Sequence, residues 1–201
     1  YDIISIKTIY DQFIEELKPY FKNLPFSIAE ENIQSRTRGN LLMALANKFG
    51  YILLNTSNKS ELATGYGTLY GDMAGGLGVI GDCYKTQVYE LAKFINVEKE
   101  LIPSNIISKA PSAELRHDQK DSDSLPEYDI LDKILYQYIE RIKGPNEIKA
   151  QDFDAALVDR ILSMVNKNEY KRNQFCPIIR VSPKAFGVGR RVPIVGNYLN
   201  W

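Results

Sequence analysis

Histidine and cysteine are scarce in this chain. His117 is the single histidine among 201 residues, and Cys83 and Cys176 are the only cysteines. Two cysteines so far apart lack the spacing of metal ligands, and they are typical of a reducing compartment rather than of a disulfide scaffold. We expect both to be buried as small apolar residues. We assign no catalytic role to His117, because a lone histidine in a polar loop is usually solvated.

Net charge and long apolar runs are also missing. Twenty-five basic and twenty-five acidic residues cancel to a formal net charge of zero, so no global field favours nucleic acid or an anionic membrane as a partner. No apolar stretch approaches the ~20 residues of a membrane span, and the N-terminus lacks a signal-peptide pattern. These absences favour a soluble, cytoplasmic protein in which any phosphate binding is local.

The composition is that of one globular domain. A chain of 201 residues that is 44% hydrophobic and 25% charged is long enough to bury a core. The opening residues, Tyr1 to Ile6, have the pattern of a β-strand, although no initiator methionine and no leader precede them. We therefore expect the chain to be a fragment of a longer protein.

Helical and extended patterns alternate along the chain. Apolar residues at three- and four-residue steps predict a helix over 8–21, and Ser27 with Glu30 forms a capping box that opens a second helix over 29–49. A strand over 51–55 follows, and the order β-α-α-β implies parallel strands joined by helical crossovers. Further elements are predicted as a close-packed turn or short strand over 73–80 and as helices over 85–95, 130–142 and 150–165. In the helix over 85–95, we expect Leu91 and Ile95 on the inner face.

Two other segments do not fit this alternation. Residues 108–126 are rich in serine, aspartate and lysine, and long polar loops inside compact domains are usually lids or binding loops. We predict a mobile loop there. Residues 177–201, in which basic residues are interleaved with prolines, are predicted to form an extended tail.

The strand over 51–54 leads into a segment, 55–72, that is dense in hydroxyls and glycines. Open α/β sheets place ligand groups at the carboxyl ends of their strands. Glu61 could hold Mg²⁺ there with phosphate oxygens and the nearby hydroxyls of Thr56 and Ser57. Lys85, at the start of a helix, could meet a phosphate. Alternatively, Glu61 is a solvated surface glutamate and Lys85 an ordinary exposed lysine.

Three longer motifs make the interpretation specific. Residues 31–38, 58–76 and 109–116 closely resemble the synthetase domain of NAD⁺ synthetases. Residues 124–129 and 185–194 resemble the glutamine-dependent class of that family more than the shorter ammonia-dependent class. The likeness covers nearly the whole chain, with the motifs in the right order.

The resemblance implies both a fold and a reaction. The fold is α/β, a Rossmann-like three-layer parallel sheet of the adenine nucleotide alpha hydrolase, or N-type ATP pyrophosphatase, kind. The reaction is a two-step amidation that makes the enzyme a ligase. The carboxylate of deamido-NAD⁺ attacks the α-phosphate of ATP to give an acyl-adenylate, and ammonia then displaces AMP. A carboxylate is a poor acyl donor until it carries such a leaving group, and Mg²⁺ and cations must meet the charge on the phosphates.

The resemblance also carries roles for individual residues. Thr56, Lys85 and Ser112 would bind ATP, with Lys85 also taking part in catalysis. Glu61 would hold Mg²⁺ or approach the dinucleotide.

The other carried-over residues concern the dinucleotide and ammonia. Asn32, Arg36 and Lys171, together with Glu61, would bind deamido-NAD⁺. Asp72 would position ammonia or take a proton from ammonium. Tyr66 could stack on a ring of the ligand or pack on the core.

The chain departs from the family pattern in what it lacks. The pyrophosphate-binding loop, Ser-Gly-Gly-x-Asp-Ser after the first strand, is absent, and so is the glutamine-hydrolysing domain. We therefore expect this fragment alone to be inactive or nearly so, because the backbone donors for pyrophosphate are missing. The expected partners are an N-terminal glutaminase domain and a second copy in a homodimer, with helix residues 32–48 at the interface.

Two alternatives to the synthetase remain. One is a non-catalytic dimerisation or nucleotide-binding fragment. The other is another adenylating ATP pyrophosphatase, against which the Asn-x-Gln-x-Arg-x-Arg pattern argues.

Overall fold

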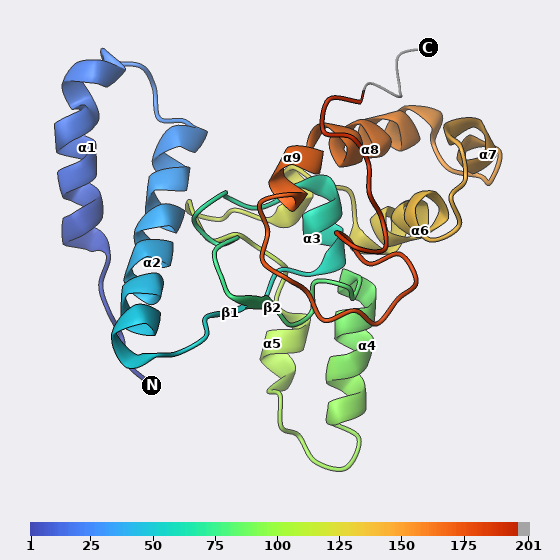
Figure 1. The fold of residues 1–201 in the computed structure, drawn as a ribbon, viewed down its shortest axis with the longest axis horizontal. Helices are drawn as coiled ribbons and strands as arrows, with labels where there is room; N and C mark the ends of the chain where they lie inside the picture. The colour runs from blue at the N-terminus through green and yellow to red at the C-terminus, as the bar shows by residue number, and fades with distance from the viewer. Residues whose placement is uncertain (197–201) are drawn as a thin grey trace.

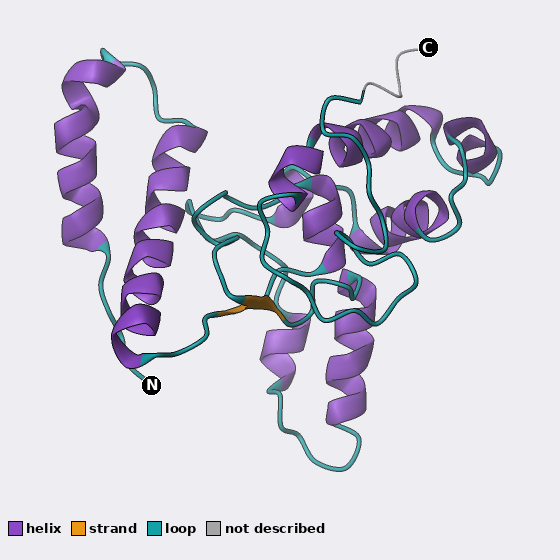
Figure 2. Cartoon of the chain, viewed as in Figure 1, coloured by secondary structure: helices purple, strands orange, loops and turns teal. Residues whose placement is uncertain are grey.

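The computed structural model describes residues 1–196 and is built mainly of helices around a short parallel sheet (Figures 1 and 2). The last residues of the predicted tail, 197–201, lie outside the described part. The elements, in chain order, are α1 Lys7–Phe21, α2 Ile28–Phe49, β1 Leu54–Asn55, α3 Lys59–Thr64, β2 Leu77–Gly78, α4 Lys85–Ile95, α5 Ser104–Ser108, the 3₁₀ helix η1 Asp121–Asp123, α6 Tyr128–Ile139, α7 Pro145–Lys149, α8 Ala155–Lys167 and α9 Glu169–Arg172.

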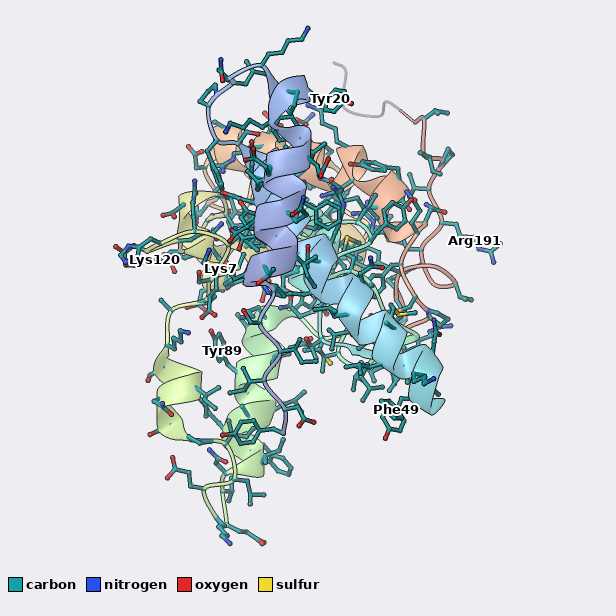
Figure 3. All side chains as sticks on the ribbon, turned by 90° about the vertical axis from the view of Figure 1, so that its left-hand side faces the viewer. Lys7, Tyr20, Phe49, Tyr89, Lys120 and Arg191 are labelled. Carbon is teal, nitrogen blue, oxygen red and sulfur yellow. The ribbon has the colours of Figure 1, made fainter. Side chains whose placement is uncertain are left out.

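Helices α1 and α2 form a pair at one side of the molecule (Figure 1). The predicted capping box opens α2, since the Ser27 amide donates to Glu30 Oε2 at 2.8 Å and Ser27 Oγ accepts from the Ala29 amide at 3.2 Å. Gly50, with φ of 70°, ends α2 in the left-handed conformation that favours glycine. Tyr20 and Phe49, at the outer ends of the pair, are exposed (Figure 3).

The strand predicted for Tyr1 to Ile6 is wrong. These residues are irregular and largely exposed up to the start of α1 at Lys7. A strand must exchange backbone hydrogen bonds with a neighbouring strand, and no neighbouring strand lies beside these residues within 1–196.

The predicted 51–55 strand does pair in parallel, but with residues 77–78 and not with residues 1–6, the partner that the β-α-α-β order implied. Leu54 pairs with Leu77 and Asn55 with Gly78, so only the end of the predicted 51–55 strand is paired. The tail adds to this sheet on the other side of β2. The Gly78 amide donates to Pro177 O at 2.8 Å, and the Ile179 amide donates to Gly78 O at 3.1 Å.

The core lies between α3, α6 and α8. Helix α3 is central, with neighbours in α4, α6, α8 and α9. The buried apolar residues of α3, Leu62 and Ala63, pack with those of α6, α7 and α8. The latter include Leu131, Ile134, Leu135, Ile148, Val158, Ile161 and Leu162. Helix α3 is therefore held rigidly by the core, and so are the side chains on its other face.

Helix α4 has the predicted bounds but not the predicted inner face. Leu91 and Ile95 are 46% and 48% exposed, and α4 has no buried residue. The amphipathic pattern is present, yet among the described residues only α3 and α6 make substantial contacts with α4. Periodicity shows which face of a helix is apolar, and the neighbouring elements decide whether that face is covered.

The two cysteines are less buried than predicted. Cys83 and Cys176 are free and half-buried rather than fully buried, and burial raises the pKa of both thiols. None of the described helices has the length and apolar character of a membrane span.

Candidate functional site

One cleft gathers the motifs that the sequence analysis singled out. Its volume is about 1270 Å³, and its walls come from α2, the end of β1, α3, the loop before β2, the start of α4, the loop after α5 and α9. Every residue predicted for the site lines it: Asn32, Arg36, Thr56, Glu61, Asp72, Lys85, Ser112 and Lys171. Residues up to 139 positions apart in sequence thus share one cleft, from Asn32 to Lys171.

The strand end is fixed by Asn55, a residue to which the sequence analysis gave no role. Asn55 is buried, and its side-chain amide donates to the carbonyls of Asp72 and Ala74 at 2.7 and 3.0 Å. Its side-chain oxygen accepts the Ser57 amide at 2.8 Å. Asn55 therefore holds the two ends of the 55–72 segment together.

Glu61 lies in the first turn of α3, a helix that the sequence analysis missed. Asn58 caps this helix, and the Asn58 and Glu61 side chains each accept the other residue's amide at 3.0 Å. This Asn-x-x-Glu capping box is a recognisable helix signal, and it could have revealed α3. Burial raises the pKa of the Glu61 carboxyl, and Lys85 opposes that rise.

Lys85 faces Glu61 from the start of α4. Its Nζ lies 3.6 Å from Glu61 Oε1, and it lies 5.8 and 5.5 Å from the ring centroids of Tyr89 and Tyr128. Both charged side chains are mostly buried, at 20% exposed each. Cation and carboxylate are thus held together at the cleft wall.

The carboxylate and hydroxyl groups beside Lys85 suit Mg²⁺ only in part. Glu61 Oε2 accepts the hydrogen bond of the Asn58 amide, so Oε1 is the oxygen that faces Lys85. Thr56 and Ser57 line the same cleft. No group of three or more acidic, histidine or cysteine side chains with metal-site geometry occurs in residues 1–196. Mg²⁺ commonly needs only one or two carboxylates when substrate phosphates and waters complete its shell. The donors present fit that mode of binding.

Helix α2 forms the opposite wall and holds the loop that contains Asp72. Asn32 Oδ1 accepts the Thr68 hydroxyl at 2.7 Å, and Arg36 Nε donates to Leu69 O at 3.1 Å. Arg36 and Asn32 are therefore fixed against this loop by their own hydrogen bonds.

Asp72 is oriented from two sides. Its Oδ1 accepts the Ser35 hydroxyl at 2.8 Å and the Thr68 amide at 2.7 Å. Ser35 Oγ also accepts the Asp72 amide at 2.9 Å. No residue among 1–196 donates a hydrogen bond to Oδ2, so that oxygen is the one left for a ligand. Sequence reasoning missed Ser35, which is buried in α2 and has no spacing signal of its own.

Lys171 reaches the cleft from α9 but already has partners. Its Nζ donates to Gly65 O at 2.7 Å and to Gly67 O at 2.9 Å. Burial lowers the pKa of Lys171, and the nearby Asp72 opposes this. The ammonium group therefore closes the turn after α3 as well as lining the cleft.

Tyr66 packs partly against the core and lines the cleft. Its hydroxyl is buried without a hydrogen-bond partner in the described chain. Burial, together with the charge of Asp121, raises the pKa of Tyr66. These contacts favour the core-packing alternative over stacking on a ligand ring.

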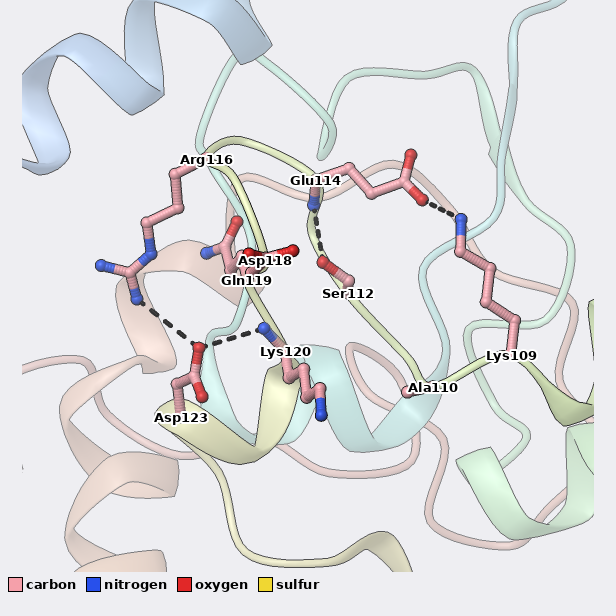
Figure 4. A pocket seen from close by; sticks show the side chains of 9 residues that line it. All are labelled: Lys109, Ala110, Ser112, Glu114, Arg116, Asp118, Gln119, Lys120 and Asp123. Carbon is pink, nitrogen blue, oxygen red and sulfur yellow. Dashed lines mark hydrogen bonds and ion pairs between the residues drawn. The ribbon is translucent and has the colours of Figure 1, made fainter.

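The predicted loop lies between α5 and α6 and contains η1 (Figure 4). Lys109 pairs with Glu114, and Ser112 Oγ accepts the Glu114 amide at 3.1 Å. Arg116 lies 3.9 Å from Asp123. These interactions are internal to the loop and mostly exposed.

The C-terminal end of this loop is anchored, because the Tyr128 hydroxyl donates to Asp121 Oδ2 at 2.8 Å and Leu125 is buried in the core. Few contacts hold its tip to the rest of the cleft. Gln34 of α2 donates to Leu115 O at 3.0 Å, and Arg116 lies 3.9 Å from Glu31. His117 is 93% exposed, in agreement with the solvated role expected for it. The loop is therefore held to α2 at its tip by one hydrogen bond and one long ion pair.

Comparison with known proteins identifies the family. The sequence model described as NAD synthase matches residues 1–175. The chain belongs to the NAD synthase family. It is 52% identical over 200 residues to a glutamine-dependent NAD(+) synthetase of Acinetobacter baylyi, a match that covers 98% of this chain and 37% of that protein. The chain thus spans about a third of the length of the curated relatives it matches.

Solved NAD synthetases share the fold of this chain. The glutamine-dependent NAD⁺ synthetase of Acinetobacter baumannii in complex with ADP has a TM-score of 0.51 and 46% identity, over 94% of this chain and 34% of that one. The NH3-dependent NAD synthetase of Campylobacter jejuni has a TM-score of 0.64 and 29% identity, over 85% of this chain and 62% of that one. The predicted α/β fold with parallel strands is confirmed. The curated relatives that are 52% and 53% identical to this chain are glutamine-dependent NAD(+) synthetases, in agreement with the class predicted from residues 124–129 and 185–194.

Proposed function

We propose that this chain is the synthetase part of an enzyme that amidates deamido-NAD⁺ to NAD⁺ with ATP through an acyl-adenylate. One observation carries the proposal: all eight side chains that the family resemblance implicated line a single cleft in a member of the NAD synthase family. The proposed ligand sites divide that cleft between a phosphate side, at α3 and α4, and a dinucleotide side, at α2 and α9.

On the phosphate side, Lys85 would neutralise charge as the α-phosphate of ATP is attacked. Its position at the N-terminus of α4 adds the positive end of that helix. Thr56 and Ser112 would hold ATP from the strand end and from the loop. Glu61 would hold Mg²⁺, which when bound supplies charge neutralisation to the phosphates.

On the dinucleotide side, Asn32, Arg36 and Lys171 would bind deamido-NAD⁺. Asp72 would use its Oδ2 to orient ammonia toward the activated carboxyl, or to take a proton from ammonium as the amide forms. The hydrogen bonds from Ser35 and Thr68 to Oδ1 support this role, because they fix the direction in which Oδ2 points.

The proposed partners extend beyond this chain. Ammonia would come free or from a glutaminase domain of a longer polypeptide, and a homodimer or a higher homo-oligomer is expected. The cysteine usage supports a cytoplasmic location. The alternative is a nucleotide-binding or dimerisation fragment without turnover.

NAD⁺ formation from deamido-NAD⁺ and ATP tests the proposal directly. The chain should be assayed alone and within a polypeptide extended to the length of its relatives, first with ammonia and then with glutamine. We expect the extended protein to form NAD⁺ with both nitrogen sources and the chain alone to form little. An extended protein that binds both nucleotides without turnover would favour the binding fragment.

Replacing Lys171 with alanine should weaken binding of deamido-NAD⁺ by ~10-fold and leave ATP binding unchanged, because loss of one charged hydrogen-bond donor costs about 1.5 kcal/mol. Calorimetry with each ligand measures the two affinities. Lys167→Ala, an exposed lysine near the end of α8, is the matched control. Equal loss of both ligands would instead indicate that Lys171 only supports the Gly65 and Gly67 carbonyls.

Bound ATP should protect residues 108–124 from limited proteolysis, by ~5-fold or more in cleavage rate. Without ATP, few contacts hold the tip of this loop, so it opens easily; contacts with bound ATP would hold it closed. Mass spectrometry of the first fragments locates the cuts. Tryptic sites elsewhere in the chain, such as those at the exposed Lys7 and Lys22, should be cut at the same rate with and without ATP and serve as the internal control. Identical cleavage of the loop under both conditions would contradict a lid.

A further inference from the structure

The first turn of α4, which carries Lys85, is capped by other helices and not by its own N-cap residue. The Tyr84 side chain makes no capping hydrogen bond, and the first turn contains no acidic residue. The first amides of a helix need acceptors from elsewhere when the N-cap supplies none. Here the acceptors come from residues 25 and 46 positions away in sequence.

Ser60 of α3 and Asp132 of α6 are these acceptors. The Lys85 amide donates to Ser60 Oγ at 2.9 Å, and the Thr86 amide donates to Asp132 Oδ2 at 2.9 Å. The Thr86 hydroxyl also donates to Asp132 Oδ2 at 2.9 Å. The Ser60 hydroxyl donates to Asp132 Oδ1 at 2.5 Å, so the two acceptors are themselves joined.

The arrangement requires an acceptor on both carboxylate oxygens of Asp132. Three donors point at this carboxylate, and the residue is only 5% exposed. A negative charge at the N-terminus of α4 is also favourable to the helix dipole. An amide at position 132 would replace one of these oxygens with an NH₂ group, which cannot accept the hydrogen bonds that the oxygen receives.

The same helix, α6, also touches the side chain of Lys85. Tyr128 and Asp132 lie one turn apart on α6. The Tyr128 ring lies 5.5 Å from Lys85 Nζ, while Asp132 holds the backbone of the turn from which Lys85 projects. Neither Ser60 nor Asp132 lines the cleft. Their connection to the cleft runs through Lys85.

We propose that Ser60 and Asp132 are positioning residues that fix the N-terminal turn of α4 and thereby aim Lys85 at a phosphate in the cleft. This inference rests on the proposed function for the identity of the ligand, whose phosphates Lys85 would meet. It assigns roles to two buried polar residues: Ser60, which lies within the 58–76 motif but received no individual role, and Asp132, which lies in none of the three motifs.

Asp132→Asn and Ser60→Ala test the proposal, with Asp129→Asn, an exposed aspartate of the same helix, as the matched control. Ser60→Ala adds no mispaired donor and covers the case in which Asp132→Asn fails to fold. We expect ~10-fold faster hydrogen exchange at the Lys85 and Thr86 amides, while amides of the core helix α8 are unchanged. Unchanged exchange at both amides would overturn the capping pair.

Ligand affinity then tests whether the pair acts through Lys85. Each variant should weaken ATP binding by ~3- to 10-fold and leave adenosine binding unchanged, because only the phosphates meet Lys85. In a Lys85→Ala background, Asp132→Asn should add less than ~2-fold, whereas independent effects would multiply. Multiplying effects, or equal loss of ATP and adenosine, would overturn the positioning role.

The proposed function can fail separately. If the unsubstituted protein, extended to the length of its relatives, binds neither ATP nor adenosine, the nucleotide site is wrong. Hydrogen exchange at Lys85 and Thr86 still decides whether Ser60 and Asp132 hold the turn.

Discussion

Replacing Lys59 with methionine should lower the free energy of unfolding by ~3–5 kcal/mol, the usual cost of removing one partner from a buried ion pair. The Lys59 side chain is 0% exposed, and its Nζ lies 2.7 Å from Asp82 Oδ1 and donates to Ser182 Oγ at 2.8 Å. It also contacts Glu140. Without the ammonium group, two carboxylates would remain buried together with no cation between them.

The contacts of Lys59 join four separate parts of the chain. They connect α3, the turn before α4, the end of α6 and the tail, in which Ser182 lies beyond residues 1–175 that match the family. The loss of stability should therefore extend to the docking of the tail. Urea unfolding followed by circular dichroism measures it.

Lys7→Met is the control for Lys59→Met, because Lys7 pairs with Asp11 in an exposed i,i+4 ion pair. Its effect should stay within ~0.5 kcal/mol. A loss below ~1 kcal/mol for Lys59→Met would contradict the buried network, since losses that small are typical of ordinary surface substitutions.

Acid unfolding gives a second measurement on the same variant. Burial by itself would raise the pKa of Asp82, but hydrogen bonds from Lys59, Val181 and Ser182 outweigh it and hold this pKa below its usual value. A carboxyl whose pKa is lower in the folded state stabilises the fold above its unfolded pKa of ~3.9 and loses that contribution as the pH falls further. In Lys59→Met this acid-dependent loss should shrink, because part of the stabilisation is already absent.

Replacing Glu61 with glutamine should reduce adenylate formation by ~10²–10³-fold in a protein extended to the length of its relatives, because one charge that acts at the developing phosphate transition state is removed. The substitution separates catalysis from folding. Glutamine keeps the oxygen that accepts the Asn58 amide, so the capping box of α3 is preserved. Only the negative charge, which faces Lys85 and would face the proposed Mg²⁺, is lost.

Pyrophosphate release with ATP and deamido-NAD⁺ measures this step without ammonia. Thermal unfolding should show a melting temperature close to that of the unsubstituted protein. Glu90→Gln, on the exposed side of α4, is expected to leave both measurements unchanged. Unchanged pyrophosphate release in Glu61→Gln would remove Glu61 from the metal and phosphate chemistry.

Local signals in the sequence predicted much of the fold. The capping box at Ser27 and the glycine at position 50 bounded α2 closely, and periodicity gave the bounds of α4. These signals depend on residues within one or two turns of each other, so a single sequence contains them in full. The missed helix α3 is six residues long, too short for a periodic pattern to emerge.

The strand predicted for Tyr1 to Ile6 failed for the opposite reason. Strand formation depends on a partner elsewhere, and the local pattern cannot supply one. The exposed Leu91 and Ile95 of α4 are a related case, since their apolar pattern is real and their cover is not within residues 1–196.

The sequence by itself determined the family and the eight residues that line the cleft, and it predicted the class of chemistry, because those motifs are linear and long. Tertiary structure alone decided how these residues are held. Asn55, Ser35, Lys59 and the pair of Ser60 and Asp132 act on groups as many as 123 residues away. A buried polar side chain must find its partner wherever the fold brings one, and no spacing in the sequence records which partner that is.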